Sequence, residues 1–185
     1  MKVGVLGLQG AVREHVRALG RLGVETRVVK AVAALESLDG LILPGGESTT
    51  MSLLAQGGLL KELRRLSAVG FPMFGTCAGM ILLANETVGR KEPILGAIDI
   101  AVARNASGRQ VDSFETVLEV EGIGSDVPAV FIRAPYVTRV GPSVHVLARH
   151  EGVAVMARQG KILVASFHPE LTEDLRIHRV FVDMI

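Results

Sequence analysis

Apolar residues in the first half of the chain form short continuous runs that alternate with stretches of helical spacing. The continuous runs predict buried strands over 2–8, 24–30, 40–43 and 71–74. Helical spacing is found over 11–22 and over 48–66, where Gly57-Gly58 interrupts it. Strands separated by helices need crossover connections, which produce a parallel sheet covered on both faces. We therefore expect an α/β fold built on an open, mostly parallel sheet with helices on both faces.

The pattern changes in the second half of the chain, from Gly96 onward. Short β-rich runs, separated by Gly, Pro, Ser and Asp, predict strands over 98–103, 116–120, 129–132, 144–148, 153–158 and 161–166. Their turn residues favour β-hairpins added to one end of the sheet. A last stretch of helical spacing predicts a closing helix over 171–184. Because no linker, repeat or low-complexity segment interrupts the sequence, we expect a single domain over 1–185.

Charge and composition narrow the classes of function. Twenty basic and nineteen acidic residues give a net charge of +1, and no segment concentrates either sign, so binding to nucleic acid or to an anionic membrane is not expected. No run approaches the roughly 20 apolar residues of a membrane span, and the apolar start is too short for a signal peptide. A single cysteine excludes an internal disulfide and suits a reducing compartment, which predicts a cytoplasmic protein.

The one cysteine lies in the sequence Gly75-Thr76-Cys77-Ala78-Gly79. An apolar strand precedes this segment directly, and an apolar helix follows it. Such a strand, glycine-flanked turn and helix are typical of the elbow that holds a nucleophile clear of a sheet, and the glycines on both sides let the backbone take the strained conformation that this requires. The N–H groups of the following helix favour a thiolate. The alternative is a small buried hydrophobic side chain, which is common for free cysteines.

A cysteine nucleophile needs a neighbouring base, and the base needs an orienting acceptor. His168 follows an apolar strand and is fixed by Pro169, while Glu170 lies close enough to contact one ring nitrogen. The alternative for these three residues is a capped strand end. The four other histidines lack such a motif: two lie on amphipathic helices, where a surface or hydrogen-bonded structural role is expected, and two lie in the hairpin region (His15, His178, His145 and His150).

A turn with two adjacent glycines follows the third predicted strand, in the run Leu43 to Thr50. Because glycines let backbone N–H groups approach a ligand, the N–H groups of Gly46 and of Ala78, directly after the cysteine, are candidates for an oxyanion hole. A plain turn with a helix N-cap would explain the same residues. Ligands bind at the carboxyl ends of parallel strands, and the topology gathers this turn, the Gln9-Gly10 turn and the cysteine and histidine turns on that rim. We expect the active site there.

The cysteine and histidine motifs together resemble those of the class I (triad) glutamine amidotransferases. Further blocks narrow the resemblance to the glutaminase subunits of pyridoxal 5′-phosphate synthase, and they span the chain from Val3 to the last helix. These blocks are Gly4 to Ala11, Leu43 to Thr50, Arg104-Asn105 with Gly108 to Gln110 and Ser113 to Glu115, and Phe131 to Pro135.

The resemblance implies that Cys77 attacks the carboxamide of L-glutamine, which gives a γ-glutamyl thioester and ammonia. His168 would accept the thiol proton and deliver a proton to the leaving nitrogen, with Glu170 orienting its ring. An arginine fits the glutamine site because its planar guanidinium can grip the α-carboxylate. The resemblance implies neither a cofactor nor a metal ion in this chain. It assigns glutamine binding to six residues: Gly46, Glu47, Ser48, Arg104, Ile132 and Arg133.

The same resemblance implies a partner, a separate (β/α)₈ synthase subunit that makes pyridoxal phosphate from ammonia, a pentose phosphate and a triose phosphate. Gln9 is expected near the contact with this subunit. Glutaminases of this kind are poorly active alone. A peptide flip at Gly45-Gly46 on docking would complete the oxyanion hole, since two glycines offer little steric resistance.

Three other functions stay open on the sequence alone. A cysteine peptidase or another hydrolase of the same architecture would transfer acyl groups from peptides or esters and would not depend on glutamine. A non-catalytic regulatory subunit would keep the scaffold without turnover. An amidotransferase module of the guanine or carbamoyl type would share the triad motif and nothing more.

Overall fold

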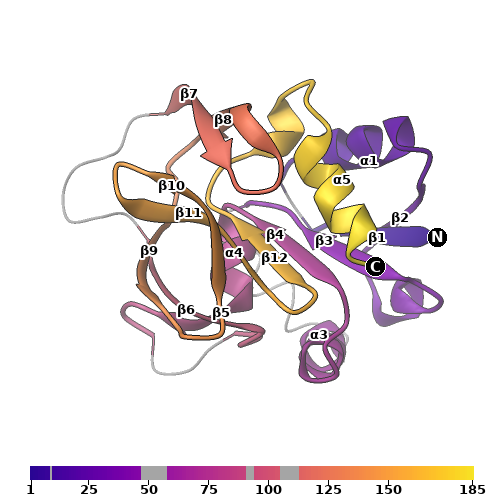
Figure 1. Cartoon of the computed structure of the whole chain (residues 1–185). Helices are drawn as coiled ribbons and strands as arrows, with labels where there is room; N and C mark the ends of the chain where they lie inside the picture. Colours follow the sequence, from indigo (N-terminus) through magenta and orange to yellow (C-terminus); the bar gives the residue numbers. More distant parts are fainter. Residues whose placement is uncertain (9, 47–57, 91–93, 105–112) are drawn as a thin grey trace.

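The computed structural model describes residues 1–8, 10–46, 58–90, 94–104 and 113–185. Within them, one large sheet has nine strands, in the order β2 (Glu25–Val29), β1 (Lys2–Leu6), β3 (Gly40–Leu43), β4 (Met73–Thr76), β12 (Ile162–Ala165), β11 (Val153–Gln159), β10 (His145–His150), β7 (Phe114–Val120) and β8 (Gly124–Phe131). A smaller sheet has the order β5 (Ala84–Thr87), β6 (Ile98–Ala103) and β9 (Tyr136–Val140). Both chain ends lie near β1 (Figure 1).

The first five strands of the large sheet, from β2 to β12, run parallel. Helix α1 (Val12–Arg21) connects β1 to β2, the 3₁₀ turn η1 (Val32–Leu35) precedes β3, and α3 (Leu59–Ala68) precedes β4. The predicted α/β architecture is therefore confirmed. The helix predicted over 48–66 is described only from Leu59, directly after Gly58 with its φ of 77°, and residues 47–57 lie outside the described part of the chain.

Side chains of the parallel strands alternate between two apolar cores, one on each face of the sheet. Leu41 and Leu43 point into the core under α3 and α4 (Ala78–Leu83), whereas Ile42 between them points into the core under α1 and α5 (Arg176–Asp183). On β4, Met73 points into the first of these cores and Phe74 into the second. Figure 1 shows α1 and α5 on one face and α3 on the other. Strands buried on both faces read as continuous apolar runs, which is why the sequence predicts them well.

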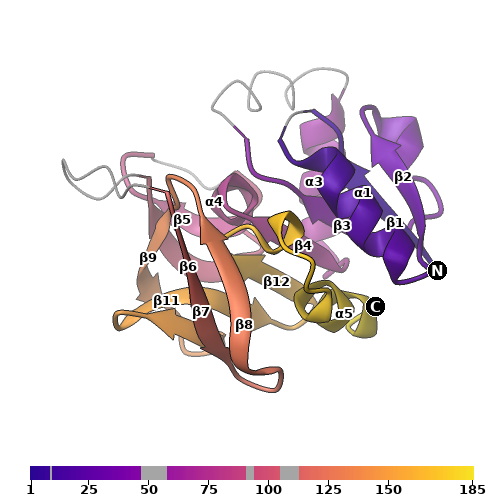
Figure 2. The ribbon, with the colours of Figure 1, turned by 90° about the horizontal axis from the view of Figure 1, so that it is seen from above.

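The second half of the chain differs from its prediction in the placement of two strands. β12, predicted as part of the hairpins, runs parallel to β4 inside the sheet, with Ala165 opposite Thr76. β6 leaves the large sheet and pairs with β5 and β9, neither of which was predicted. The hairpins β7–β8 and β10–β11 do extend the large sheet, as expected. Figure 2 shows these antiparallel strands on one side and the parallel strands with α1 and α3 on the other.

The closing helix is shorter than predicted. Residues Pro169–Leu171 form the 3₁₀ turn η3, and α5 begins only at Arg176. The Asp174 carboxylate accepts a hydrogen bond from the backbone N–H of Arg176 (2.8 Å), the first residue of the helix. None of the helices in the described residues has the length and apolar character needed to cross a membrane.

Helix α4 lies close to β3 and β4 because two residues at this contact, Gly75 and Gly79, have no side chain. A Cβ atom at Gly79 would collide with the carbonyl oxygen of Leu43. A Cβ atom at Gly75 would lie 2.5 Å from the carbonyl oxygen of Gly79. The start of α4, which directly follows Cys77, is therefore set by backbone packing and not by side chains.

We predict that Gly79→Ala lowers the free energy of unfolding by about 1–3 kcal/mol, because the added methyl group must push α4 away from β3. Gly20→Ala is the matched control: Gly20 lies on α1 with no atom within 4 Å of its added Cβ, so the change should be neutral or stabilising by up to about 1 kcal/mol. Urea unfolding of both variants measures the difference. Equal stability of the two would contradict the packing argument.

Candidate active site

Cys77, between β4 and α4, has a backbone conformation that is unfavourable for any residue except glycine. Its φ is 50° and its ψ is −110°. Two backbone hydrogen bonds hold it, from its N–H to the carbonyl oxygen of Ala165 (2.8 Å) and from the N–H of Met80 to its own carbonyl oxygen (3.0 Å). The side chain is partly exposed, so it is not the buried hydrophobic residue of the alternative. Strain of this kind in a well-held residue is typical of functional sites.

The strained conformation expected at the glycine-flanked turn lies at Cys77 itself. Neither Gly75 nor Gly79 has a positive φ. The glycines instead let α4 and the strands approach closely, as described above. This close approach holds the turn in place from both sides.

His168 and Glu170 follow β12, the neighbour of the strand that leads to Cys77. The backbone N–H of His168 donates to the carbonyl oxygen of Val130 (2.8 Å), and its ring Nδ1 contacts Oε1 of Glu170 at 2.7 Å. A carboxylate can only accept, so Nδ1 carries the proton of this bond. The Glu170 side chain has no exposed surface and that of His168 is 11% exposed. The orienting contact predicted from the sequence is present.

Gly45 shows how close the cysteine and the imidazole lie. A Cβ atom at Gly45 would be 2.9 Å from Cε1 of His168 and 3.1 Å from Cβ of Cys77. Burial disfavours the charged imidazole, but hydrogen bonds with Cys77 and Glu170 outweigh that effect and raise the pKa of His168 to about 10. The ring therefore holds a proton at neutral pH, one that it can donate to a reacting group.

Cys77 and His168 line a pocket of about 700 Å³. Five residues predicted from the sequence line it with them: Gly46, Ala78, Arg104, Ile132 and Arg133. Five more lining residues had no role assigned from the sequence, because only the fold brings them to the pocket: Ala11, Ile81, Ser113, Pro135 and Leu171. The predicted Gln9, Glu47 and Ser48 lie outside the described residues. Within the described ranges, no group of three or more His, Cys, Asp or Glu side chains could hold a metal ion.

The pocket wall opposite the cysteine turn carries a second strained residue, Arg133, with a φ of 44°. The carbonyl oxygen of the preceding Ile132 lies 3.8 Å from Sγ of Cys77, a weak S–H···O contact. Two arginines, Arg104 and Arg133, line the pocket, and none of the lining residues that the structure describes is acidic. This charge distribution favours a ligand that carries a carboxylate.

Comparison with known proteins places this arrangement in a family. The model of the SNO glutamine amidotransferase family matches residues 5–185. The chain belongs to this family. The resemblance inferred from the sequence is thereby confirmed.

Individual relatives of this amidotransferase chain match it over its whole length. Pyridoxal 5′-phosphate synthase subunit PdxT of Geobacillus sp. (strain WCH70) is 55% identical over 186 residues, which cover 100% of this chain and 97% of that protein. PdxT of Carboxydothermus hydrogenoformans is 55% identical over 187 residues, with 100% and 98% covered. A solved glutamine amidotransferase structure has a TM-score of 0.91 at 53% identity and covers 98% of this chain and 97% of its own. PurLQS from Thermotoga maritima, 17% identical with a TM-score of 0.76, shares the fold.

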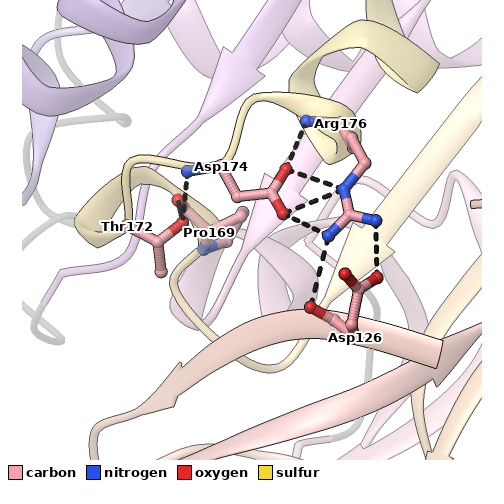
Figure 3. A network of polar contacts seen from close by, with 5 residues as sticks. All are labelled: Asp126, Pro169, Thr172, Asp174 and Arg176. Atoms are coloured by element: carbon pink, nitrogen blue, oxygen red, sulfur yellow. Dashed lines mark hydrogen bonds and ion pairs between the residues drawn. The ribbon is translucent and has the colours of Figure 1, made fainter. Parts of the chain in front are cut away.

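A polar network in this amidotransferase ties η3 and the start of α5 to the β7–β8 hairpin (Figure 3). Arg176 donates from Nη2 to Asp174 (2.6 Å) and from Nη1 to Asp126 on β8 (2.7 Å). The Thr172 hydroxyl donates to the carbonyl oxygen of Pro169 (3.0 Å) and accepts from the N–H of Asp174 (3.2 Å). The network therefore holds the segment that carries the buried carboxylate of the site.

We predict that Glu170→Gln lowers the pKa of His168 from about 10 toward its ordinary value of 6.5, because the neutral amide no longer stabilises the charged ring. At pH 8 the ring should be protonated in the wild type, and a larger fraction of it should be neutral in the variant. NMR titration of ¹⁵N-labelled histidine measures both. Glu173→Gln, at an exposed carboxylate three residues away, is the control and should leave His168 unchanged. An unaltered His168 titration in Glu170→Gln would contradict the assigned contact.

Proposed function

We propose that this chain is the glutaminase subunit of a pyridoxal 5′-phosphate synthase and hydrolyses L-glutamine to L-glutamate and ammonia. One observation carries the proposal: a strained, partly exposed cysteine lies beside a buried His168–Glu170 pair in a pocket with two arginines. The full-length identity to proteins named PdxT supports the assignment to this synthase.

We assign the glutamine site to the pocket residues Gly46, Arg104, Ile132 and Arg133, with Glu47 and Ser48 of the same loop. The guanidinium groups of Arg104 and Arg133 suit the substrate α-carboxylate, since an arginine can bind a carboxylate with two parallel hydrogen bonds. With the α-carboxylate held there, the side chain of glutamine can extend toward the cysteine. The pocket thereby selects glutamine by the charge of its α-carboxylate at one end and by its reactive side-chain carboxamide at the other.

The first half-reaction forms a thioester. Sγ of Cys77, having given its proton to His168, attacks the carboxamide carbon, and the N–H groups of Gly46 and Ala78 stabilise the oxyanion. When the C–N bond breaks, the His168 imidazolium donates its proton to the leaving nitrogen, which departs as ammonia. Glu170 binds Nδ1–H throughout, which directs the other ring nitrogen to the sulfur and the substrate.

The second half-reaction releases glutamate. Neutral His168 removes a proton from a water molecule as that water attacks the thioester carbon. The C–S bond then breaks, and the sulfur departs as a thiolate beside the newly charged imidazolium. Glutamate leaves the pocket, and the starting pair of Cys77 and His168 is restored.

We further propose that a (β/α)₈ synthase subunit receives the ammonia, and that its docking near Gln9 activates the glutaminase. The turn after Gln9 contacts the Gly45-Gly46 turn, which carries one of the two proposed oxyanion-hole N–H groups. A Cβ atom at Gly10 would collide with the carbonyl oxygen of Gly45. A shift of this turn on docking would therefore move the Gly45-Gly46 peptide. Two adjacent glycines allow that peptide to rotate with little steric resistance.

We predict that Cys77→Ala abolishes ammonia release from glutamine, with a loss of more than about a thousandfold, because no other group can form the acyl intermediate. Folding and docking to the synthase subunit should be unchanged. A coupled glutamate assay and size-exclusion chromatography of the mixed subunits measure these properties. Ammonia release at the wild-type rate would rule the mechanism out, and an inactive wild-type protein in the complex would favour the regulatory alternative.

We also predict that adding the synthase subunit raises the kcat of the wild-type glutaminase. The comparison is a titration of one subunit against a fixed amount of the other at saturating glutamine. Equal rates with and without the synthase subunit would remove the activation proposal. They would leave the roles of Cys77, His168 and Glu170 standing.

A further inference from the structure

Four polar side chains from four different elements meet in the core beneath the proposed catalytic residues. They are His15 of α1, Thr76 of β4, Glu170 of η3 and His178 of α5, and all four are buried. Nδ1 of His15 lies 3.0 Å from Nε2 of His178. Nε2 of His15 lies 3.2 Å from the Thr76 hydroxyl oxygen and 3.5 Å from Oε1 of Glu170. None of the steps above uses either of these two histidines.

Both histidines are neutral at physiological pH. Burial, followed by repulsion from His178 and His168, holds the pKa of His15 well below its ordinary value. Burial lowers the pKa of His178 to about 4. In a neutral imidazole one nitrogen donates and the other accepts, so the contact between the two rings has only two arrangements.

The surroundings decide between the two arrangements. If Nδ1 of His15 were the donor, its Nε2 lone pair would face the Glu170 carboxylate, and the N–H at Nδ1 of His178 would be buried with no acceptor among the described residues. Both features are unfavourable. If Nε2 of His178 donates instead, His15 carries its proton on Nε2, which bonds to the Thr76 hydroxyl and lies 3.5 Å from the Glu170 carboxylate. Nδ1 of His178, which has no partner among the described residues, then carries a lone pair and no hydrogen, so no buried N–H group is left without an acceptor.

The carboxylate that His15 faces has few other partners. Oε1 of Glu170 contacts both His168 and His15, whereas Oε2 has no hydrogen-bond partner within the described residues. A carboxylate with no exposed surface is costly to bury unless N–H groups face it. Helix α1 also contacts the chain just after η3 at the surface, where Arg21 donates to the exposed Glu173 (2.6 Å).

We propose that His15 is a positioning residue of the site: His178 sets its tautomer, and its Nε2–H holds the Glu170 carboxylate against the His168 ring. The inference rests on the proposed glutaminase function for its kinetic consequence only. The contact itself is a property of the folded chain and affects the sulfur of Cys77 whether or not glutamine is the substrate.

The test compares His15→Leu, His15→Gln and the control Leu19→Ala. Leucine fills the space without donating, glutamine returns an N–H group near the position of Nε2, and Leu19 is a fully buried residue of the same helix and has no polar contact with the site. Two rates are measured: glutamine hydrolysis in the complex with the synthase subunit, and alkylation of Cys77 by iodoacetamide without glutamine.

His15→Leu should lower kcat by about tenfold to a hundredfold, as is typical when a group that orients a functional side chain is removed, with KM nearly unchanged. It should also slow alkylation, because a displaced His168 stabilises less thiolate. His15→Gln should recover most of both rates, and Leu19→Ala should lower neither. Wild-type rates in His15→Leu, or equal losses in Leu19→Ala and no recovery with glutamine, would overturn the proposal.

A second pair of variants covers the case in which His15→Leu does not fold. His178→Leu frees the tautomer of His15 and should lower both rates in the same direction, while His178→Gln should restore them. Wild-type rates in His178→Leu would overturn the role of His178 in setting the tautomer. If the wild-type complex hydrolyses no glutamine, the proposed function fails, and the alkylation rates still decide the role of His15.

Discussion

The contact between Nδ1 of His168 and Oε1 of Glu170 constrains the whole site. A fully buried carboxylate must be compensated by hydrogen-bond donors, since the desolvation of one ion costs several kcal/mol in a protein. Here the hydrogen bond comes from His168, directly before η3, and His15 of α1 lies 3.5 Å from the same carboxylate oxygen; α1 and α5 cover the same face of the sheet. The two ends of the sequence must therefore pack together before the imidazole can be oriented.

The parallel pairing of β4 with β12 supplies the other half of the geometry. Ala165 lies opposite Thr76 in this pair, and the N–H of Cys77 continues the ladder by donating to the carbonyl oxygen of Ala165. Because the two strands are parallel, the segments that follow them leave the sheet at the same edge, and the sulfur and the imidazole lie side by side there. A shift of one residue in this register would turn every side chain of one strand to the opposite face and separate the two groups. The sheet register is thus as important to the chemistry as the residues themselves.

How far the sequence predicts this structure depends on whether a signal is local. The buried parallel strands are a local signal and are predicted correctly, as is the contact between His168 and Glu170, which lie two residues apart. The apolar run of β12 is also recognisable, but a sequence does not say which neighbour a strand pairs with, so its place inside the sheet was missed. His15 and His178 follow helical spacing, which marks a face of each helix but not the fact that the two faces meet. The glycines beside Cys77 are predicted from the turn that they flank, whereas close packing also requires them: Gly79 lies against Leu43, and Gly75 lies against Gly79.

The most direct test of a cysteine nucleophile held by the His168–Glu170 pair is to trap the acyl intermediate. The complex with the synthase subunit would be quenched in acid during glutamine turnover, digested and analysed by mass spectrometry. We expect one γ-glutamyl group on the peptide that contains Cys77, present in the wild type and absent in Cys77→Ala. Turnover of glutamine with no adduct on that peptide, or an adduct on a different residue, would contradict this account.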